Sequence, residues 1–315
     1  MMQCLVILPP GSERIVDADE EVFLLYSRAN SSSKPRGLGF VDNRQDVLSL
    51  SFELKPLLST TVTKGKGKRK HTTTVGEKTI EIQLLQDKTA LRSRAGDTGS
   101  VVWQASIDFA KLILQEQYVK LPTALFDCER IRTSHVLELG SGTGLLGIAL
   151  SQLFAHYTIT DISELQTLIT KNLKLNFPRW PGGSPTDPGH NISALELNWQ
   201  TLETLPPSRR GHYFALPDSA YDLVLVVDCI YHPSLLPSLV GAIDYVTTTG
   251  KTEVVVVMEL RAEDVTREFL ERWLAAGNGE WDIWRAATNL EETYVVWVGR
   301  KRSTLAEVDV QLVVH

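Results

Sequence analysis

One short segment constrains the fold of this chain more than any other, the glycine-rich run Glu138-Leu-Gly-Ser-Gly-Thr-Gly-Leu-Leu-Gly147. It follows the apolar stretch 135–139 and leads into the apolar residues 145–154, so a strand is predicted to turn into a helix here. Glycine is favoured in such a tight turn, and it lets a ligand approach the backbone closely. The free N–H groups at the start of the helix favour an electron-rich group. The run therefore predicts a ligand-binding loop at the edge of a sheet.

From Ser100 onward, helical and extended patterns alternate, which is typical of a parallel sheet covered by helices on both faces. The apolar spacing predicts helices that include residues 107–114, 145–154, 163–173, 235–246 and 262–276. Ser163 and Gln166 form a predicted capping box for the third of these helices. Short apolar stretches predict seven strands, at 135–139, 157–160, 195–199, 221–227, 254–258, 294–298 and 308–314. The expected fold class is α/β.

Residues before about 98 follow a different pattern. Apolar and polar residues alternate within 48–54 and 80–84, which predicts two half-buried strands of a hairpin. The Thr/Lys/Gly tract between them, 60–75, is too polar and too rich in glycine to pack. We therefore expect a small β-rich N-terminal extension, 1–98, with a mobile basic loop at about 60–78, followed by a larger domain, 99–315.

The charge of the chain is distributed unevenly. Residues 60–78 carry six basic side chains and one acidic side chain, a surplus of five positive charges. The formal net charge of the whole chain is −6, so −11 falls on the remaining residues. A basic loop is thus attached to an acidic body. The loop is either a solvated linker or a contact for nucleic acid or an import receptor, and the sequence leaves both interpretations open.

The cysteines and the apolar runs bear on the compartment. Cys4, Cys128 and Cys229 are odd in number and widely spaced, which argues against a disulfide framework and fits a reducing compartment. The purest apolar run, 254–258, is far shorter than the roughly 18 residues of a membrane span. The stretch 4–8 lacks the basic flank of a secretory signal. We expect a monomer in the cytoplasm, with the nucleus as a second location and no membrane contact.

The glycine run by itself is compatible with several ligands. Gly142, Gly144 and Gly147 match the spacing of the dinucleotide fingerprint, whereas a phosphate-binding P-loop is excluded because no Lys-Ser/Thr pair follows. Asp161 ends the next predicted strand, 23 residues after Glu138. A carboxylate at this place can accept hydrogen bonds from both hydroxyls of an adenosine ribose, and its alternative role is to cap the next helix. We favour the ribose role because of the glycine turn upstream.

A second group of candidate residues follows the fourth predicted strand, which ends in Val227-Asp228-Cys229-Ile230-Tyr231. This places an acid and an aromatic residue at the carboxyl edge of the sheet, where open α/β sheets bind ligands. Asp228 and Tyr231 are therefore the candidate catalytic residues. Cys229 and His232 are three residues apart, but no second pair has metal-ligand spacing, so no metal is expected.

Five separated elements together resemble family 16 protein methyltransferases, which are mostly specific for lysine. They are Val102-Trp103 at a helix start, the 138–147 run, Asp161, Leu-Asn-Trp199 at a strand end and Asp228-Xaa-Xaa-Tyr231. The resemblance covers about residues 99–260 in order and spacing. It implies a seven-stranded Rossmann-like class I methyltransferase sheet that binds S-adenosyl-L-methionine. The cofactor contacts that it implies are Trp103, Gly140, Ser141, Gly142, Asp161, Trp199 and Val227.

The resemblance also implies a role for each site residue. The backbone of 140–142 would lie beside the methionine part of the cofactor, while Trp199 and Val227 would form an apolar wall for the adenine. Trp103 would add aromatic surface near the sulfonium, although either tryptophan could instead fill the core. Asp228 would attract and orient the ammonium of a substrate lysine, and Tyr231 would accept a hydrogen bond from it or line its channel.

Looser motifs resemble the fungal ribosomal lysine methyltransferases within this family. They are Leu38-Gly39-Phe40, the Lys/Arg loop, Leu91-Arg92-Ser93-Arg94 and Glu259-Leu260-Arg261. This resemblance implies that the target is a lysine of a large-subunit ribosomal protein.

Four other functions stay open. The 228–231 segment is similar to the Asp-Pro-Pro-Tyr element of methyltransferases that act on nucleic-acid bases; both prolines are absent, but the basic loop would suit RNA. The glycine spacing also permits a nicotinamide-dependent oxidoreductase. The chain could further be a non-catalytic module that binds ribosomes, or a methyltransferase that acts on another translation factor.

Overall fold

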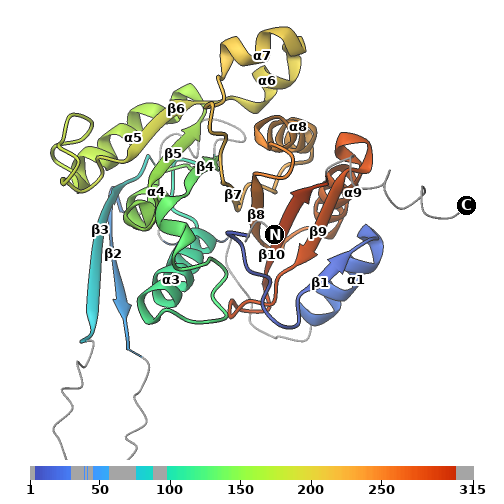
Figure 1. Ribbon diagram of the computed structural model, residues 1–315, viewed down its shortest axis with the longest axis horizontal. Coiled ribbons are helices and arrows are strands. Elements are labelled where there is room, and N and C mark those ends of the chain that lie inside the picture. The colour runs from blue at the N-terminus through green and yellow to red at the C-terminus, as the bar shows by residue number, and fades with distance from the viewer. Residues whose placement is uncertain are drawn as a thin grey trace, which may run out of the picture.

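The computed structural model describes residues 4–29, 39, 41, 45–56, 76–87 and 98–302. An eight-stranded sheet lies at the centre, with the strand order β1-β9-β10-β8-β7-β4-β5-β6 (Figure 1). Five neighbouring strands are parallel: β6 (Ile192–Glu196), β5 (His156–Asp161), β4 (His135–Leu139), β7 (Leu223–Val227) and β8 (Glu253–Glu259). The antiparallel strands β10 (Tyr294–Lys301), β9 (Trp281–Arg285) and β1 (Glu13–Ile15) extend the sheet beyond β8.

Helices cover both faces of the sheet because the central strands bury side chains in both directions. Val224 and Val226 point into one hydrophobic core, and Leu223, Leu225 and Val227 point into the other. The first core is shared with α1 (Ala18–Ala29), α6 (Trp199–Thr204), α8 (Leu236–Val246) and α9 (Glu263–Gly279). The second core is shared with α3 (Gln104–Val119), α4 (Leu145–Leu150) and α5 (Ser163–Asn176). The predicted α/β fold class with a Rossmann-like parallel core is confirmed, but the sheet has eight strands within the described residues instead of the seven that were expected.

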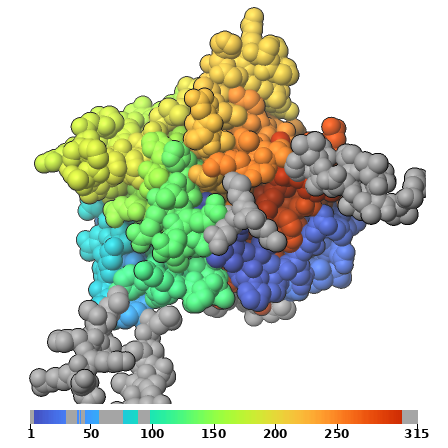
Figure 2. Space-filling view, viewed as in Figure 1, coloured from blue at the N-terminus to red at the C-terminus, as the bar shows by residue number. Residues whose placement is uncertain are grey.

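The connections add short elements at the rim of the sheet. The described part of the chain contains three short 3-10 helices. One precedes β4 (Arg130–Thr133), one follows α4 (Ser151–Leu153) and one precedes α8 (Pro233–Leu235). The helix α7 (Pro207–Tyr213) buries none of its residues, and together with α6 it projects from the body as the yellow segment at the top of Figure 2. None of the helices within the described ranges is long and apolar enough to cross a membrane.

Two expectations about the strands were wrong. The third strand was expected at 195–199, but β6 ends at Glu196, and Asn198 caps α6 by accepting a hydrogen bond from the N–H of Thr201. As an edge strand β6 is half exposed, so its apolar signal is weak. The strands β9 and β1 were missed, although Trp281 and Ile283 alternate with more exposed residues. The strand expected at 308–314 lies outside the described residues.

The hairpin predicted in the N-terminal part is confirmed as an antiparallel pair of β2 (Val47–Leu54) and β3 (Lys78–Leu85). Its apolar face packs against α3, α4 and α5. The side-chain amide of Asn172 in α5 bonds both the N–H and the C=O of Leu85, at 2.7 Å and 3.1 Å, which fixes the hairpin edge to the helix. The basic tract 60–75 and the motif 91–94 lie outside the described residues.

The start of the chain joins the end of the sheet. β1 pairs with β9 in the register Glu13↔Arg285, and α1 packs against α9. The N–H groups of Leu5 and Val6 donate to the buried carboxylate of Glu253, at 2.7 Å and 2.8 Å. Segments on both sides of residue 98 thus share the main sheet.

Candidate active site

A cavity of about 540 Å³ lies at the carboxyl ends of β4, β5, β6 and β7. It is bordered by the glycine loop after β4, the end of β5, the start of α6, the segment after β7 and the residues that lead into α3. The structure brings every candidate site residue to its lining: Trp103, Gly140, Ser141, Gly142, Asp161, Trp199, Val227, Asp228 and Tyr231. Gly99, which was not among the candidates, also lines it, and so does Asn198 of the Leu-Asn-Trp199 element.

The glycine loop approaches its surroundings so closely that side chains do not fit. Gly140 has φ +70°, and a Cβ there would lie 2.6 Å from Cys229 Sγ and 3.0 Å from the Trp199 ring. Gly142 has φ +56°, and its Cβ would lie 2.8 Å from the carbonyl oxygen of Gly99. Ser141 fastens the loop to β5, because its hydroxyl donates to the carbonyl of Thr160 at 2.7 Å. The loop therefore presents its backbone to the cavity.

Asp161 joins the end of β5 to the glycine loop. Its Oδ2 accepts from the N–H of Gly142 at 2.7 Å, and its Oδ1 accepts from the N–H of Ile162 at 2.8 Å. The carboxylate lies in the cavity lining, and each of its oxygens can accept more than one hydrogen bond, ligand hydroxyls included. The predicted capping box of the next helix is wrong: Ile162 is its N-cap and Ser163 already belongs to it. The amide of Gln166 instead donates to the carbonyls of Asp161 and Leu195, which ties α5 to the ends of β5 and β6.

Two tryptophans border the cavity. Trp199 is the first residue of α6, and its buried indole N–H has no hydrogen-bond partner among the described atoms. Trp103 precedes α3, and its indole N–H donates to the carbonyl of Thr98 at 2.8 Å. Each ring therefore forms part of the lining rather than lying wholly within the core.

Beneath the loop, Glu138 is a buried acid. The pKa of Glu138 is raised to about 8, mainly by burial and in smaller part by the negative charge of Asp161. The hydrogen bond that it accepts from the Tyr157 hydroxyl at 3.0 Å acts in the opposite direction and lowers the pKa. Glu138 is therefore mostly protonated at pH 7, and it carries a hydrogen-bonding rather than an ionic role. The neighbouring Cys229 thiol is also inert, because burial raises its pKa well above the usual value and its Sγ donates to the carbonyl of Leu139.

The raised pKa of Glu138 predicts a pH-dependent stability. Its contribution to the free energy of unfolding, on the order of 5 kcal/mol, is complete below the unfolded pKa of about 4.5 and is lost as the pH rises through about 8. Glu138→Gln keeps an acceptor for Tyr157 but cannot ionise. We expect the melting temperature of the native protein to fall more steeply than that of the variant between pH 5.5 and 9. Parallel curves would show that Glu138 is ionised throughout.

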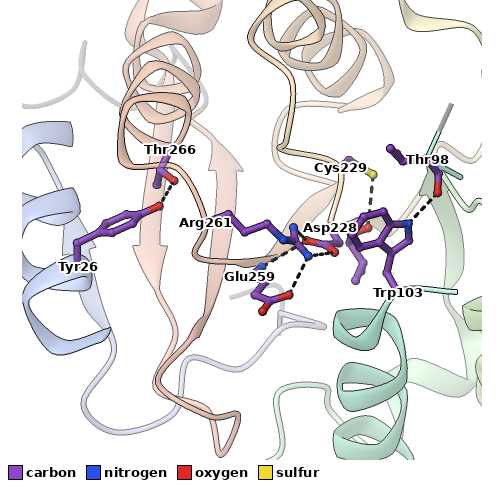
Figure 3. A network of polar contacts seen from close by, with 9 residues as sticks. Tyr26, Thr98, Trp103, Asp228, Cys229, Glu259, Arg261 and Thr266 are labelled. Carbon is purple, nitrogen blue, oxygen red and sulfur yellow. Dashed lines mark hydrogen bonds and ion pairs between the residues drawn. The ribbon is translucent and has the colours of Figure 1, made fainter. Parts of the chain in front are cut away.

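Asp228 lies in a network of polar contacts rather than alone at the strand end (Figure 3). Asp228 follows β7 directly, and its backbone has φ +58°, a conformation that residues other than glycine rarely adopt. Arg261 donates to both of its carboxylate oxygens, Nη1 to Oδ1 and Nη2 to Oδ2, each at 2.7 Å. Sequence reasoning singled out Arg261 only through the Glu-Leu-Arg segment and did not pair it with Asp228. Tyr231 lies half-buried in the cavity lining.

In the part of the chain that the structure describes, no group of three or more His, Cys, Asp or Glu side chains could hold a metal ion. Cys229 is packed beneath Gly140, and His232 lies exposed at the cavity rim. The protein groups that could contact a bound molecule in this cavity are backbone amides, carboxylates and aromatic rings.

Comparisons with known proteins converge on one family. A family model described as lysine methyltransferase matches residues 85–275. The ribosomal lysine N-methyltransferase 5 of Zygosaccharomyces rouxii is 26% identical over 283 residues, covering 79% of this chain and 85% of that protein. The protein N-lysine methyltransferase METTL21A of Xenopus tropicalis is 30% identical over 159 residues, covering 50% of this chain and 57% of that protein.

A further relative carries a different name. The diaminohydroxyphosphoribosylamino-pyrimidine deaminase of Schizosaccharomyces pombe is 26% identical over 258 residues, covering 81% of this chain and 51% of that protein. The chain thus spans little more than half the length of this relative and of METTL21A.

Proposed function

Since the chain belongs to the lysine methyltransferase family, we propose that it transfers a methyl group from S-adenosyl-L-methionine to the side-chain amine of a protein lysine. The observation that carries the proposal is the convergence of all nine candidate residues on one cavity at the carboxyl edge of the sheet. The chemistry of the lining fits this cofactor, which supplies an electrophilic methyl group on a sulfonium when bound.

Different lining residues would contact different parts of the cofactor. The glycine loop, in which a Cβ at Gly140 would lie 2.6 Å from Cys229, offers bare backbone to the methionine part. Asp161, already held by the N–H of Gly142, would accept the ribose hydroxyls. Trp199 and Val227 would give the adenine a flat apolar wall, and the free indole N–H of Trp199 would gain an acceptor.

The reaction requires a neutral lysine amine. A lysine ammonium has a reference pKa near 10.4, so its deprotonation at pH 7 costs about 4 to 5 kcal/mol. Removing the amine from water lowers its pKa, and the half-buried lining can do this without a dedicated base. Tyr231 would hydrogen-bond the amine and hold it in line, and positioning of this kind can remove several kcal/mol of the barrier.

We propose a lysine of a large-subunit ribosomal protein as the substrate. Two observations support it: the similarity to the ribosomal lysine methyltransferase of Zygosaccharomyces rouxii over most of its length, and the basic tract between 60 and 78. Lys55, exposed at the end of β2 and outside that tract, adds one further positive charge. Contact of this region with ribosomal RNA would bring the cavity to a ribosomal lysine, in the cytoplasm or in the nucleus.

Labelling of ribosomes tests this proposal. Ribosomes from cells that lack the protein are incubated with it and with labelled S-adenosyl-L-methionine, and the labelled residue is identified by mass spectrometry. We expect label on a lysine of a large-subunit protein. Tyr231→Phe should lower the rate roughly tenfold or more, because one hydrogen bond to the amine is lost, while cofactor affinity stays within about twofold.

Each other outcome is informative. Label in RNA or in a soluble translation factor would contradict the ribosomal-protein substrate. Absence of label from every lysine, with normal cofactor binding, would contradict the enzymatic activity and favour a binding module.

A further inference from the structure

Arg261 connects three parts of the molecule around the cavity (Figure 3). It holds both oxygens of Asp228, which follows β7, at 2.7 Å. Its Nη2 also donates to the carboxylate of Glu259, at the end of β8, at 2.8 Å. Its guanidinium carbon lies 5.1 Å from the centre of the Trp103 ring, within the range of a cation–π contact. One side chain thus joins two strand ends to the start of α3.

The ion pair between Arg261 and Asp228 is largely buried. The side chain of Asp228 is 3% exposed and that of Glu259 is 6% exposed, against 28% for Arg261. Burial disfavours the charged guanidinium, yet the hydrogen bonds and charges of Asp228 and Glu259 raise the pKa of Arg261. A lysine ammonium could reach the carboxylate of Asp228 only by displacing a two-bond arginine contact, which is among the strongest that a carboxylate makes.

A segment from the N-terminal part packs against the same arginine. The N–H of Gln104 donates to the carbonyl of Gly39 at 2.8 Å, and the N–H of Val41 donates to the carbonyl of Val102 at 3.1 Å. Gly39 has φ +91°, and a Cβ there would lie 2.5 Å from Arg261 Nη2 and 2.8 Å from Glu259. Residue 39 therefore has to be glycine for Arg261 to occupy its place.

From these contacts we infer that Asp228 acts on the reaction through Arg261, as one half of a positioning pair, and does not itself bind the substrate lysine. The pair fixes the left-handed turn that leads from β7 to Tyr231, and it holds the Trp103 ring at the cavity wall. The inference rests on the proposed lysine methyl transfer and replaces the direct role that the sequence suggested for Asp228. Arg261 becomes a positioning residue of that reaction.

A double-mutant cycle separates the two roles of Asp228. Asp228→Asn, Arg261→Met and the double variant are compared with the native protein in kcat/KM for the substrate and in Kd for S-adenosyl-L-methionine, the latter by calorimetry. If Asp228 works only through Arg261, each single variant loses about a hundredfold in kcat/KM, and the double variant loses no more than the worse single variant. If Asp228 binds lysine directly, Asp228→Asn costs the same factor with or without Arg261, and the inference is overturned.

Further variants guard against a merely structural explanation. Gly39→Ala should displace Arg261 and lower kcat/KM as Arg261→Met does, whereas Arg261→Lys should restore only part of the activity because an ammonium cannot bond both oxygens of Asp228 in a fixed plane. Arg285→Met is the matched control, since Arg285 pairs with the buried Glu21 beside β1, away from the cavity. It should lower the melting temperature and leave kcat/KM unchanged.

Cofactor binding gives a readout that does not depend on the substrate. Looser packing of Trp103 should raise the Kd for S-adenosyl-L-methionine about three- to tenfold in both Arg261→Met and Asp228→Asn. The Kd of the double variant should be no higher than that of the weaker-binding single variant. Additive changes in Kd would overturn the pairing even if no lysine substrate were methylated. A native protein that methylates no lysine while its Kd values follow the cycle would instead contradict the proposed function alone.

Discussion

Replacing Asp161 with alanine should lower the affinity for S-adenosyl-L-methionine at least a hundredfold. The variant would lose the two hydrogen bonds proposed between the ribose and the carboxylate, each worth about 1.5 to 3 kcal/mol. It also leaves the N–H of Gly142 without the acceptor that now lies 2.7 Å away, so the glycine loop is held less firmly. Calorimetric titration of the cofactor measures the change directly, without any knowledge of the protein substrate.

Glu196→Gln is the matched control for this loss. Glu196 lies directly opposite Asp161 in the pairing of β5 with β6, and its side chain is exposed and lies outside the cavity lining. Removal of its charge should change the affinity less than twofold. An Asp161→Ala variant that binds the cofactor as well as the native protein would show that the ribose lies elsewhere.

Gly140→Ala should abolish measurable cofactor binding while the protein stays folded. The new Cβ would collide with Cys229 Sγ at 2.6 Å and with the Trp199 ring at 3.0 Å, so the wall proposed for the adenine has to move. The positive φ of +70° adds about 1 to 2 kcal/mol of backbone strain. Circular dichroism checks the fold, and calorimetry together with tryptophan fluorescence follows the binding.

Gly144→Ala separates the collision from the strain. Gly144 also has a positive φ, +79°, but a Cβ there would make ordinary contacts, with the nearest atom 3.6 Å away on Ile169. We expect a similar loss of stability and a much smaller loss of affinity. Equal losses of affinity in the two variants would attribute the effect to backbone strain in the loop and not to closure of the cavity.

The positions of the glycine loop and of Asp161 at the cavity could be predicted because they depend on local sequence. A loop whose backbone must approach its surroundings closely requires glycine. An acidic residue at the end of a parallel strand lies at the carboxyl edge of the sheet. The hairpin was predictable for a similar reason, since alternation over 48–54 and 80–84 leaves few other structures.

The partner of Asp228 could not be predicted in this way. Arg261 lies 33 residues further along the chain, beyond β8, and only the parallel pairing of β7 with β8 brings the two together. The same limit applies to β1, whose three residues carry no strand signal and depend on pairing with Trp284 and its neighbours. Contacts between distant segments depend on topology, which local patterns do not encode.

The pairing of β1 with β9 also determines the order in which the chain can be completed as it is synthesised. Residues 13 and 285 are 272 positions apart, and the N–H groups of Leu5 and Val6 find their acceptor only at Glu253. At 5 to 20 residues per second, β1 and α1 therefore wait roughly 15 to 50 s until β9 and α9, against which they pack, have been synthesised. During that time the apolar face of α1, with Val22 and Leu25, has no native partner and is exposed to chaperones. The sheet therefore gains β1 only after β9 has been synthesised.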